Sequence, residues 1–263
     1  SYDFSANWSM NRNKVLSLGG NNEPIIKEGA YSGNHFITQI GQPIGCYYLL
    51  IQDGIFHDRA ELDSYPHEAT TQVGDYRFVD VNGDGVIAQE SDRAIAGNYM
   101  PDFCYGFSIQ LGYKGFDLAA NFQGVYGNEI LNLERRYLCE YACNNGNSRE
   151  MFNRFPFGEG LRMTRKPTGY TQSWISTAFL QDGSYFRLQN LTLGYTMPNK
   201  WFKGTGISNL RIYAQGNNLF TLTNYAGYNP EVNRNSSDPL KPGEDYCAYP
   251  LQRTITIGLS LNL

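Results

Sequence analysis

The sequence predicts an all-β fold: an antiparallel transmembrane β-barrel of which this chain is a C-terminal segment, supplying about seven strands, with long loops between some of them. Three observations predict it. Several segments alternate between apolar and polar residues, the period of a strand with one apolar face. Tyrosine and glycine are frequent, at 20 and 28 of 263 residues, while charged residues make up only 17%, below the usual quarter. There is no apolar run of about 18 residues that would predict a transmembrane helix.

The closing segment, 253–263, carries the clearest strand pattern. Every second residue is apolar, and the residues between are threonine, glycine, serine and asparagine. The apolar positions are Ile255, Ile257, Leu259, Leu261 and Leu263. This length matches the roughly 9–11 residues that a tilted strand needs to cross a bilayer.

Residues 104–126 show the same alternation twice, on the two sides of a Lys114-Gly115 turn signal. The apolar faces hold Tyr105, Phe107, Ile109, Leu111 and Tyr113, and then Phe116, Leu118, Ala120 and Phe122. The opposite faces are small or polar and almost uncharged. This is the pattern of a barrel wall with lipid on one side and water on the other.

Four further strands are expected, at 1–10, 34–52, 184–196 and 208–221. In the segment 184–196, Leu191, Leu193 and Tyr195 share a face, but Phe186 and Leu188 are out of phase with them. A β-bulge, or extension of the strand beyond the membrane, would explain this change of phase.

The connections between these strands are unequal. Short links are expected at 113–116 and 197–207, and long ones at 53–102, 127–183 and 222–250. Barrels of this kind have short periplasmic turns and long extracellular loops. With a periplasmic C-terminus, the three long connections are therefore predicted to be extracellular. The link 11–33 is then an exception, a long connection on the periplasmic side.

The segment 80–92, in the predicted loop 53–102, matches the start of an EF-hand-like calcium loop, D-x-[DN]-x-[DN]-G. Three side-chain oxygens stand at alternate positions, Gly85 permits a sharp turn, and a backbone carbonyl can add a ligand. An all-oxygen set of this kind suits Ca²⁺. The candidate metal ligands are Asp80, Asn82, Asp84, Val86, Glu90 and Asp92.

The match to this calcium loop breaks at its twelfth position, where a bidentate carboxylate belongs and Ser91 stands. Glu90 and Asp92 flank that position. Either the loop carries an extra residue and Asp92 closes the site, or the site is weak. The alternative without metal is an Asn/Gly turn tightened by hydrogen bonds to the Asp and Asn side chains.

Other candidate sites are weaker. The histidines His35, His57 and His67 are scattered, and no nucleophile, zinc or phosphate-loop motif is present, so we expect no catalytic residues and no enzyme activity. Glu61 and Asp63 lie in a polar stretch that favours solvated surface. A disulfide between Cys139 and Cys143 would have poor geometry at i, i+4 spacing in a helix.

The net charge restricts the possible functions further. The net charge is −4 and no Lys/Arg run occurs, which argues against nucleic-acid binding. The chain begins at Ser1 in the middle of a predicted strand, without Met or a signal peptide, so we expect a longer protein.

The alternative interpretation is a secreted, calcium-stabilised β-sandwich that binds carbohydrate, because such a fold also has alternating strands. Long loops are uncommon in compact domains, which favours the barrel.

Several blocks of sequence, taken together, resemble the C-terminal region of the SusC/RagA-like TonB-dependent transporters. They are GDYRFVDVNGDG at 74–85, DRAIAGNYMPDFCYGFSIQLGYKGFDLAANFQG at 92–124, LQDGSYFRLQNLTLGYTMP at 180–198, LRIYAQGNNLFTLTNYAGYNPEV at 210–232 and YPLQRTITIGLSLNL at 249–263. QPIGCYYLLIQDGIF at 42–56 is similar to the family's segment before its first long loop. The resemblance covers almost the whole chain, and the order and spacing of the blocks make it specific.

The resemblance implies a large plugged barrel of about 22 strands in the lipid bilayer of the bacterial outer membrane, with this chain as about its last third. It implies import of glycans or peptides, so that an oligosaccharide or peptide substrate enters beneath a SusD-like surface lipoprotein that caps the mouth. TonB would act on an N-terminal region absent from this chain. The remainder of the barrel and the plug would be obligatory partners, because open sheet edges cannot sit in lipid.

Two features depart from the family's pattern. The metal-like loop of the family usually closes with Asp one residue earlier, so Asp92 stands one place beyond the family's position. Leu263 stands where the family commonly ends in an aromatic residue, often Phe.

Overall fold

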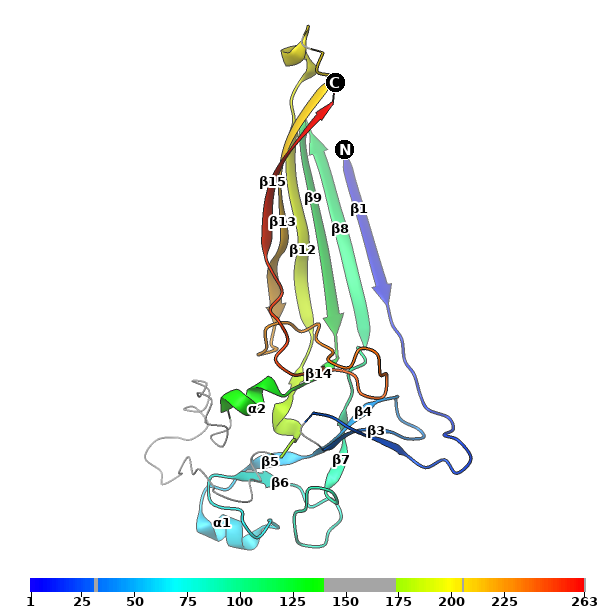
Figure 1. Ribbon diagram of the computed structural model, residues 1–263, viewed down its shortest axis with the longest axis vertical. Coiled ribbons are helices and arrows are strands. Elements are labelled where there is room, and N and C mark those ends of the chain that lie inside the picture. The colour runs from blue at the N-terminus through cyan, green and yellow to red at the C-terminus, as the bar shows by residue number, and fades with distance from the viewer. Residues whose placement is uncertain (31–32, 140–173, 205, 263) are drawn as a thin grey trace.

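The computed structural model describes residues 1–30, 33–139, 174–204 and 206–262. Its largest element is a six-stranded antiparallel sheet (Figure 1). In spatial order the strands are β1 (Tyr2–Ser9), β8 (Phe103–Tyr113), β9 (Phe116–Tyr126), β12 (Tyr185–Thr196), β13 (Asn209–Thr223) and β15 (Thr254–Asn262). The outer strands β1 and β15 leave the described sheet open. The predicted all-β, antiparallel barrel wall is confirmed.

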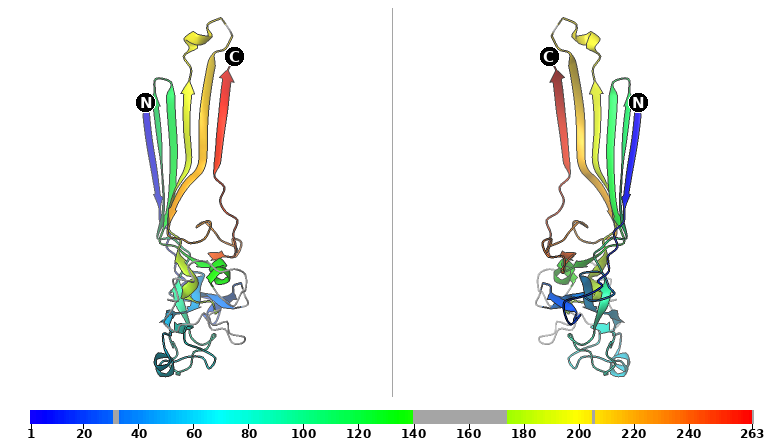
Figure 2. Two further views of the ribbon diagram at one scale, coloured as in Figure 1. Left: turned by 90° about the vertical axis from the view of Figure 1, so that its left-hand side faces the viewer. Right: turned by 90° about the vertical axis from the view of Figure 1, so that its right-hand side faces the viewer.

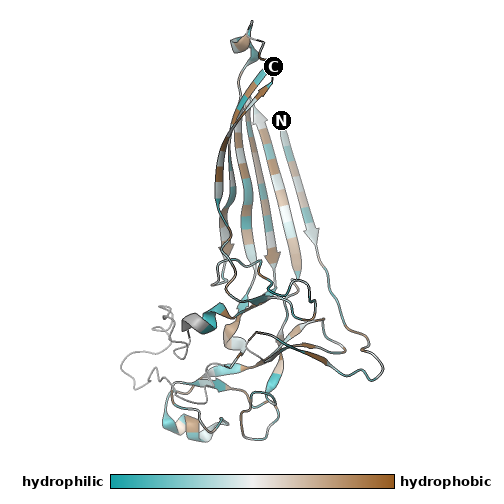
Figure 3. Ribbon diagram, viewed as in Figure 1, coloured by the Kyte–Doolittle hydropathy of each residue, from teal (hydrophilic) through white to brown (hydrophobic). Residues whose placement is uncertain are grey.

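One face of this sheet is apolar across all six strands. The registers place Ile109 opposite Ala120 and Ala120 opposite Leu191, so the apolar positions of neighbouring strands share this face. Many of its side chains are exposed: Ile257 is 80% exposed and Phe4 is 66% exposed. Figure 3 shows apolar and polar residues alternating along the strands. An apolar face of this extent that none of the described residues covers is typical of a surface that contacts lipid.

Aromatic rings pack side by side on the apolar face. The ring centroids of Phe107 and Phe122 are 4.5 Å apart, and those of Phe122 and Phe186 are 5.6 Å apart. Phe220 continues the row, 6.4 Å from Phe186. Four neighbouring strands contribute one ring each, and such pairs stabilise a sheet by about 0.5–1.5 kcal/mol beyond their area burial.

β12 contains a β-bulge, as one of the two explanations of its change of phase predicted. Its register with both β9 and β13 shifts between Leu188 and Asn190, which leaves Gln189 as the extra residue. The bulge returns Phe186 and Leu188 to the same face as Leu191.

All three long connections leave the sheet at one end, and the short ones join strands at the other end (Figures 1 and 2). The short ones are the Lys114-Gly115 turn and residues 197–208, which include the 3₁₀ helix η4 (Asn199–Phe202). The long ones run over 10–102, 127–184 and 224–253. We call the end with the short links the short-turn end.

Two predictions about the first long connection are wrong. The segment 34–52 is no barrel strand: it holds β3 (Asn34–Thr38) and β4 (Cys46–Leu50), which pair with each other outside the large sheet. Because β1 pairs directly with β8, the described sheet has six strands and not seven. The link 11–33 therefore lies at the end with the other long connections, and the exception disappears.

The described parts of the three long connections form a unit of their own, which we call the loop body. It contains three small sheets. These are β2 (Ile25–Glu28) with β3, β4 and β7 (Arg93–Gly97); β5 (Gln52–Ile55) with β6 (Tyr76–Phe78); and β11 (Leu180–Asp182) with β10 (Glu129–Asn132) and β14 (Glu244–Asp245). The short helices are α1 (Arg59–Ser64), α2 (Glu134–Cys139) and η3 (Thr177–Phe179).

The main hydrophobic core lies in the loop body and not in the large sheet. Its largest cluster combines Phe36 and Tyr47 of the first connection with Leu131, Leu133 and Phe179 of the second, each at most 1% exposed. β10 of the second connection pairs in parallel with β14 of the third. Common core packing and strand pairing therefore hold the three connections to one another.

None of the described helices is long and apolar enough to cross a membrane. Cys143 lies outside the described residues, so its expected poor pairing with Cys139 stays a prediction.

Candidate functional site

The second face of the large sheet is polar, and one register level carries polar residues on all six strands. These are Ser5, Ser108, Asn121, Asn190, Asn217 and Thr254. The hydroxyls of Ser5 and Ser108 are 2.7 Å apart, and Asn190 Nδ2 donates to Asn217 Oδ1 at 2.8 Å. This uncharged row of hydroxyl and amide groups is what a water-filled barrel interior requires.

A charged pair on this polar face reaches across one strand. Nε of Arg211, on β13, donates to Oδ1 of Asp117, on β9, at 2.9 Å. Gly194 of the intervening β12 leaves the room, because a Cβ at this position would lie 2.5 Å from Arg211 Nη2. The two opposite charges compensate each other, and the wall around them stays neutral.

A second ion pair joins the wall to the loop body. Arg187, on β12 and 2% exposed, pairs with Glu231 of the third connection, and its Nη2 donates to Asn229 Oδ1 at 3.1 Å. Glu231 also accepts from the Tyr185 hydroxyl at 2.7 Å and from Gln123 Nε2 at 3.0 Å. These contacts hold the third connection against the polar face at the mouth of the wall.

A hollow of about 800 Å³ lies at this junction. Its polar lining includes Asn7, Asn121, Gln123, Tyr185 and Glu231. The volume is within the roughly 300–1,000 Å³ of small-molecule sites. Its hydroxyl and amide groups can exchange hydrogen bonds with a polar substrate at the end of the wall where the long connections begin.

Buried polar groups fix the loop body. The Tyr47 hydroxyl lies 2.9 Å from the carbonyl oxygens of both Glu129 and Gly243. Burial raises the pKa of Tyr47 well above its ordinary value, so the hydroxyl stays protonated. Fully buried Glu244 accepts from the Ala30 N–H at 2.7 Å. One tyrosine and one glutamate therefore tie together all three connections.

His35 lies beside Glu244 without a hydrogen bond. It is 1% exposed, its Nδ1 is 3.8 Å from Glu244 Oε1, and neither ring nitrogen has a hydrogen-bond partner among the described residues. Burial lowers the pKa of His35. His57 and His67 lie in other contacts, around Glu61 and Tyr65 respectively, so the three histidines do not form a shared site.

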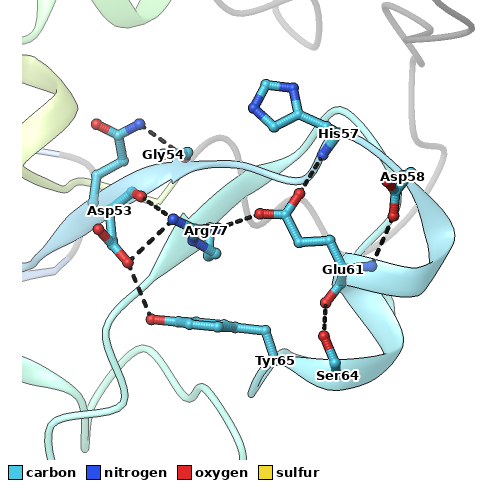
Figure 4. A network of polar contacts seen from close by, with 9 residues as sticks. Asp53, Gly54, His57, Asp58, Glu61, Ser64, Tyr65 and Arg77 are labelled. Atoms are coloured by element: carbon cyan, nitrogen blue, oxygen red, sulfur yellow. Dashed lines mark hydrogen bonds and ion pairs between the residues drawn. The ribbon is translucent and has the colours of Figure 1, made fainter.

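The carboxylates Glu61 and Asp63 have different roles, as Figure 4 shows for Glu61. Glu61 pairs with Arg77 and accepts from the His57 N–H at 2.8 Å, while Arg77 Nη2 also donates to the Asp53 carbonyl at 2.7 Å. Asp63 instead pairs with Arg59 at 2.8 Å on the exposed side of α1. Glu61 is therefore a structural link between α1 and β6, and Asp63 alone fits the prediction of solvated surface.

The candidate calcium ligands Asp80 and Asp92 accept hydrogen bonds from backbone N–H groups. Asp80 accepts from Gly85 at 2.8 Å and Gly83 at 2.6 Å, and the bond from Gly85 is the main cause that lowers the pKa of Asp80. Buried Asp92 accepts from Ala88 at 2.8 Å. The Asp92 carboxylate thus closes the loop by accepting a hydrogen bond from its backbone.

The other candidate ligands are engaged in similar local contacts. Asn82 Nδ2 donates to Asp84 Oδ2 at 2.9 Å, and the Val86 N–H donates to Asp84 Oδ1 at 2.9 Å. Glu90 is turned toward Arg93, at 3.5 Å. Within the described ranges, no three His, Cys, Asp or Glu side chains gather as a metal site. Carboxylate oxygens that accept one N–H keep a free lone pair, so calcium stays a prediction.

Comparison with known proteins decides the family. No family model matches the chain. It is 34% identical to TonB-dependent receptor P3 of Formosa agariphila over 97% of this chain and 26% of the receptor. It is 30% identical to TonB-dependent receptor P26 of the same organism, over 96% of this chain and 26% of that receptor. It is 25% identical to TonB-dependent receptor SusC of Bacteroides thetaiotaomicron, over 99% of this chain and 24% of SusC.

The chain belongs to the SusC-like TonB-dependent receptors. It spans about a quarter of the length of these relatives. Receptors of this family lie in the bacterial outer membrane, which is the location of this receptor.

The fold of the receptor agrees with this assignment. It superposes on the RagAB peptide transporter with a TM-score of 0.77 at 21% identity, over 99% of this chain and 26% of that chain. It superposes on the RagAB peptide importer in the open-open state with a TM-score of 0.76 at 22% identity, over 100% of this chain and 26% of that chain.

Sequence reasoning missed the Arg187–Glu231 junction of this receptor. The two residues are 44 positions apart, and no local pattern links them. The available signal was Arg187 itself, a lone arginine on a strand of an otherwise nearly uncharged wall. Such a charge needs a partner when it is buried.

Proposed function

We propose that this receptor imports glycans or peptides across the outer membrane with energy from TonB, and that this chain supplies barrel wall and the extracellular loop body. One observation carries the proposal: a single sheet, apolar on one face and neutral and polar on the other, whose long connections all leave at one end. This arrangement suits a wall between lipid and an aqueous path.

In this mechanism the loop body faces the cell exterior and meets a SusD-like lipoprotein that acts as a lid. The substrate enters past the junction of Arg187 and Glu231 and meets the hydroxyl and amide row of the polar face. TonB acts on the N-terminal region of the longer protein and displaces the plug. No covalent step is involved.

The class of substrate is proposed as a glycan or a peptide. The hollow has side-chain hydroxyls, amides and one carboxylate, and both classes present complementary donors and acceptors. Similarity to SusC and to the RagAB peptide transporter supports an importer of polar oligomers.

The alternative function, a secreted calcium-stabilised sandwich that binds carbohydrate, needs a second sheet packed about 10 Å from the apolar face. The described residues place no sheet there, and Ile255, Ile257 and Leu259 are each more than 60% exposed. The importer therefore accounts for the exposed face and the sandwich does not.

The native mass of the detergent-solubilised protein, with mass spectrometry of every polypeptide in it, tests the importer. We expect a large complex that contains plug-bearing sequence and a surface lipoprotein. A species of about this chain's mass that is stable in plain buffer would contradict the proposal. Uptake of labelled oligosaccharide and peptide mixtures by cells with and without the receptor then separates the two substrate classes.

A further inference from the structure

The two short links at the short-turn end carry positive charge only. The turn residues 113–116 and 197–208 contain three lysines and no aspartate or glutamate. Lys200 and Lys203 are exposed, and Lys114 Nζ lies 5.1 Å from the ring centroid of Tyr113. Among the described residues, no carboxylate forms an ion pair with any of these lysines, in contrast to Lys241 of the loop body, which pairs with Asp238.

The two turns that carry the lysines are neighbours. The Thr196 N–H at the end of β12 donates to the Gly115 carbonyl at 2.7 Å, and the rings of Phe116 and Tyr195 are 4.5 Å apart. η4 follows directly and projects beyond the ends of the strands, as Figures 1 and 2 show. The lysines therefore belong to one surface.

Exposed aromatic side chains accompany these lysines at the short-turn end. Tyr113 is 70% exposed, Phe116 is 55% exposed, and Trp201 of η4 is 59% exposed. Exposed aromatic rings at strand ends are typical of the interface between hydrocarbon and headgroups. Aromatic residues Trp8 and Phe103 mark the other end of the apolar face, with ring centroids 6.2 Å apart.

The distance between the two aromatic levels matches a membrane. β8 runs from Phe103 to Tyr113 over 11 residues, and at about 3.4 Å per residue with a tilt of about 40° it spans about 26 Å of the membrane normal. This is about the height of the apolar band of such barrels. Lys114, directly after Tyr113, thus lies just outside the hydrocarbon, and η4 with Lys200 projects farther out on the same side (Figure 1).

We propose that Lys114, Lys200 and Lys203, with Trp201 beside them, bind the phosphate groups of anionic phospholipids in the leaflet at the short-turn end. The ammonium groups supply the charge, and the indole ring sits at the headgroup level. The inference relies on the membrane orientation in the proposed function and on no property of the substrate.

The test uses the full-length receptor with its partner proteins, reconstituted in nanodiscs of phosphatidylglycerol and phosphatidylcholine. Native mass spectrometry counts the lipids that stay bound. The variant Lys200→Gln/Lys203→Gln is compared with Lys14→Gln/Lys27→Gln, which removes two lysines of the first long connection. We expect at least a twofold loss of bound phosphatidylglycerol in the first variant, with phosphatidylcholine and the control variant unchanged.

Unchanged phosphatidylglycerol, or an equal loss in the control variant, would overturn the proposal. A salt titration of the wild-type receptor gives a second measurement that needs no variant, because screening weakens exposed charge pairs. Phosphatidylglycerol enrichment that resists high salt would also overturn it. Substrate uptake is measured on the same preparations, and a missing plug or lid would defeat the proposed function while leaving the lipid count interpretable.

Discussion

Gly45 shows how a single residue fixes one connection against another. Its φ is +66°, a backbone conformation that favours glycine. A Cβ at Gly45 would lie 2.8 Å from the Pro239 carbonyl oxygen and 2.7 Å from Pro242 Cδ. The first connection therefore approaches the third more closely than any residue other than glycine at position 45 would permit.

The substitution Gly45→Ala is expected to destabilise the loop body by the cost of a positive φ, about 1–2 kcal/mol, plus about 1–3 kcal/mol for the clash. Gly41→Ala is the matched control, because Gly41 has a φ of +87° and a Cβ added there would have no other atom within 4 Å. Hydrogen exchange of the β3 and β4 amides measures both. Equal effects of the two substitutions would show that the contact with Pro239 has no energetic weight.

His35 gives the loop body a pH dependence whose sign follows from burial. Burial lowers the pKa of His35 from its ordinary 6.5, so the unfolded segment binds a proton at a pH where the folded one does not. The stability from neutral His35 is present above about pH 6.5 and decreases as the pH falls below that value. His35→Gln should remove this slope, measured as the opening free energy of 33–38 by hydrogen exchange corrected for intrinsic rates. An unaltered slope would contradict the assignment to His35.

At the scale of elements, strand prediction worked where one face meets lipid and failed where both faces are buried. β8, β9 and β15 alternate over their whole length, and the pattern placed them correctly. Cys46–Leu50 is instead an apolar run with four of five residues buried, and such a run does not show which sheet it joins. The Arg187–Glu231 junction was equally hidden, because sequence patterns do not reveal contacts between distant segments.

The bulge of β12 makes a prediction about deletions. Removal of Gln189, the exposed extra residue, should keep every neighbouring side chain on its present face, and the variant should still assemble. Removal of Thr192, a regular position opposite Ala119, should put half of the strand on the wrong face and prevent assembly. The heat-dependent gel shift of the folded barrel distinguishes the two, and assembly of the Thr192 deletion would contradict the argument.

Substitutions in the loop 80–92 can distinguish an aspartate with a structural role from one that acts through a metal ion. Asp92→Ala should open the loop with or without calcium, because Asp92 accepts from the backbone at Val81 and Ala88. If calcium binds, chelation should speed proteolysis of the wild-type loop, and Asp84→Ala should abolish that sensitivity. Asp63→Ala, on exposed α1, serves as the control. A wild-type loop indifferent to chelation would leave the hydrogen-bonded turn as the whole explanation.

At the scale of the molecule, one part exposes its apolar residues and another part buries them. The large sheet exposes its apolar face, whereas the loop body buries Phe36, Tyr47 and Leu131 in a core of its own. The family resemblance and the alternation together predicted the sheet and the end from which the long connections leave. They did not predict the loop body as a packed unit, because its contacts join segments that are far apart in sequence.

The tie between Ala30 and Glu244 spans 214 residues, and this separation has a consequence for the order of events in folding. Because the chain is synthesised from its N-terminus, Glu244 is added only after the residues of five of the six wall strands. Contacts of such long range form slowly. The loop body is therefore completed late, because its first connection lacks this partner from the third connection until Glu244 is in place.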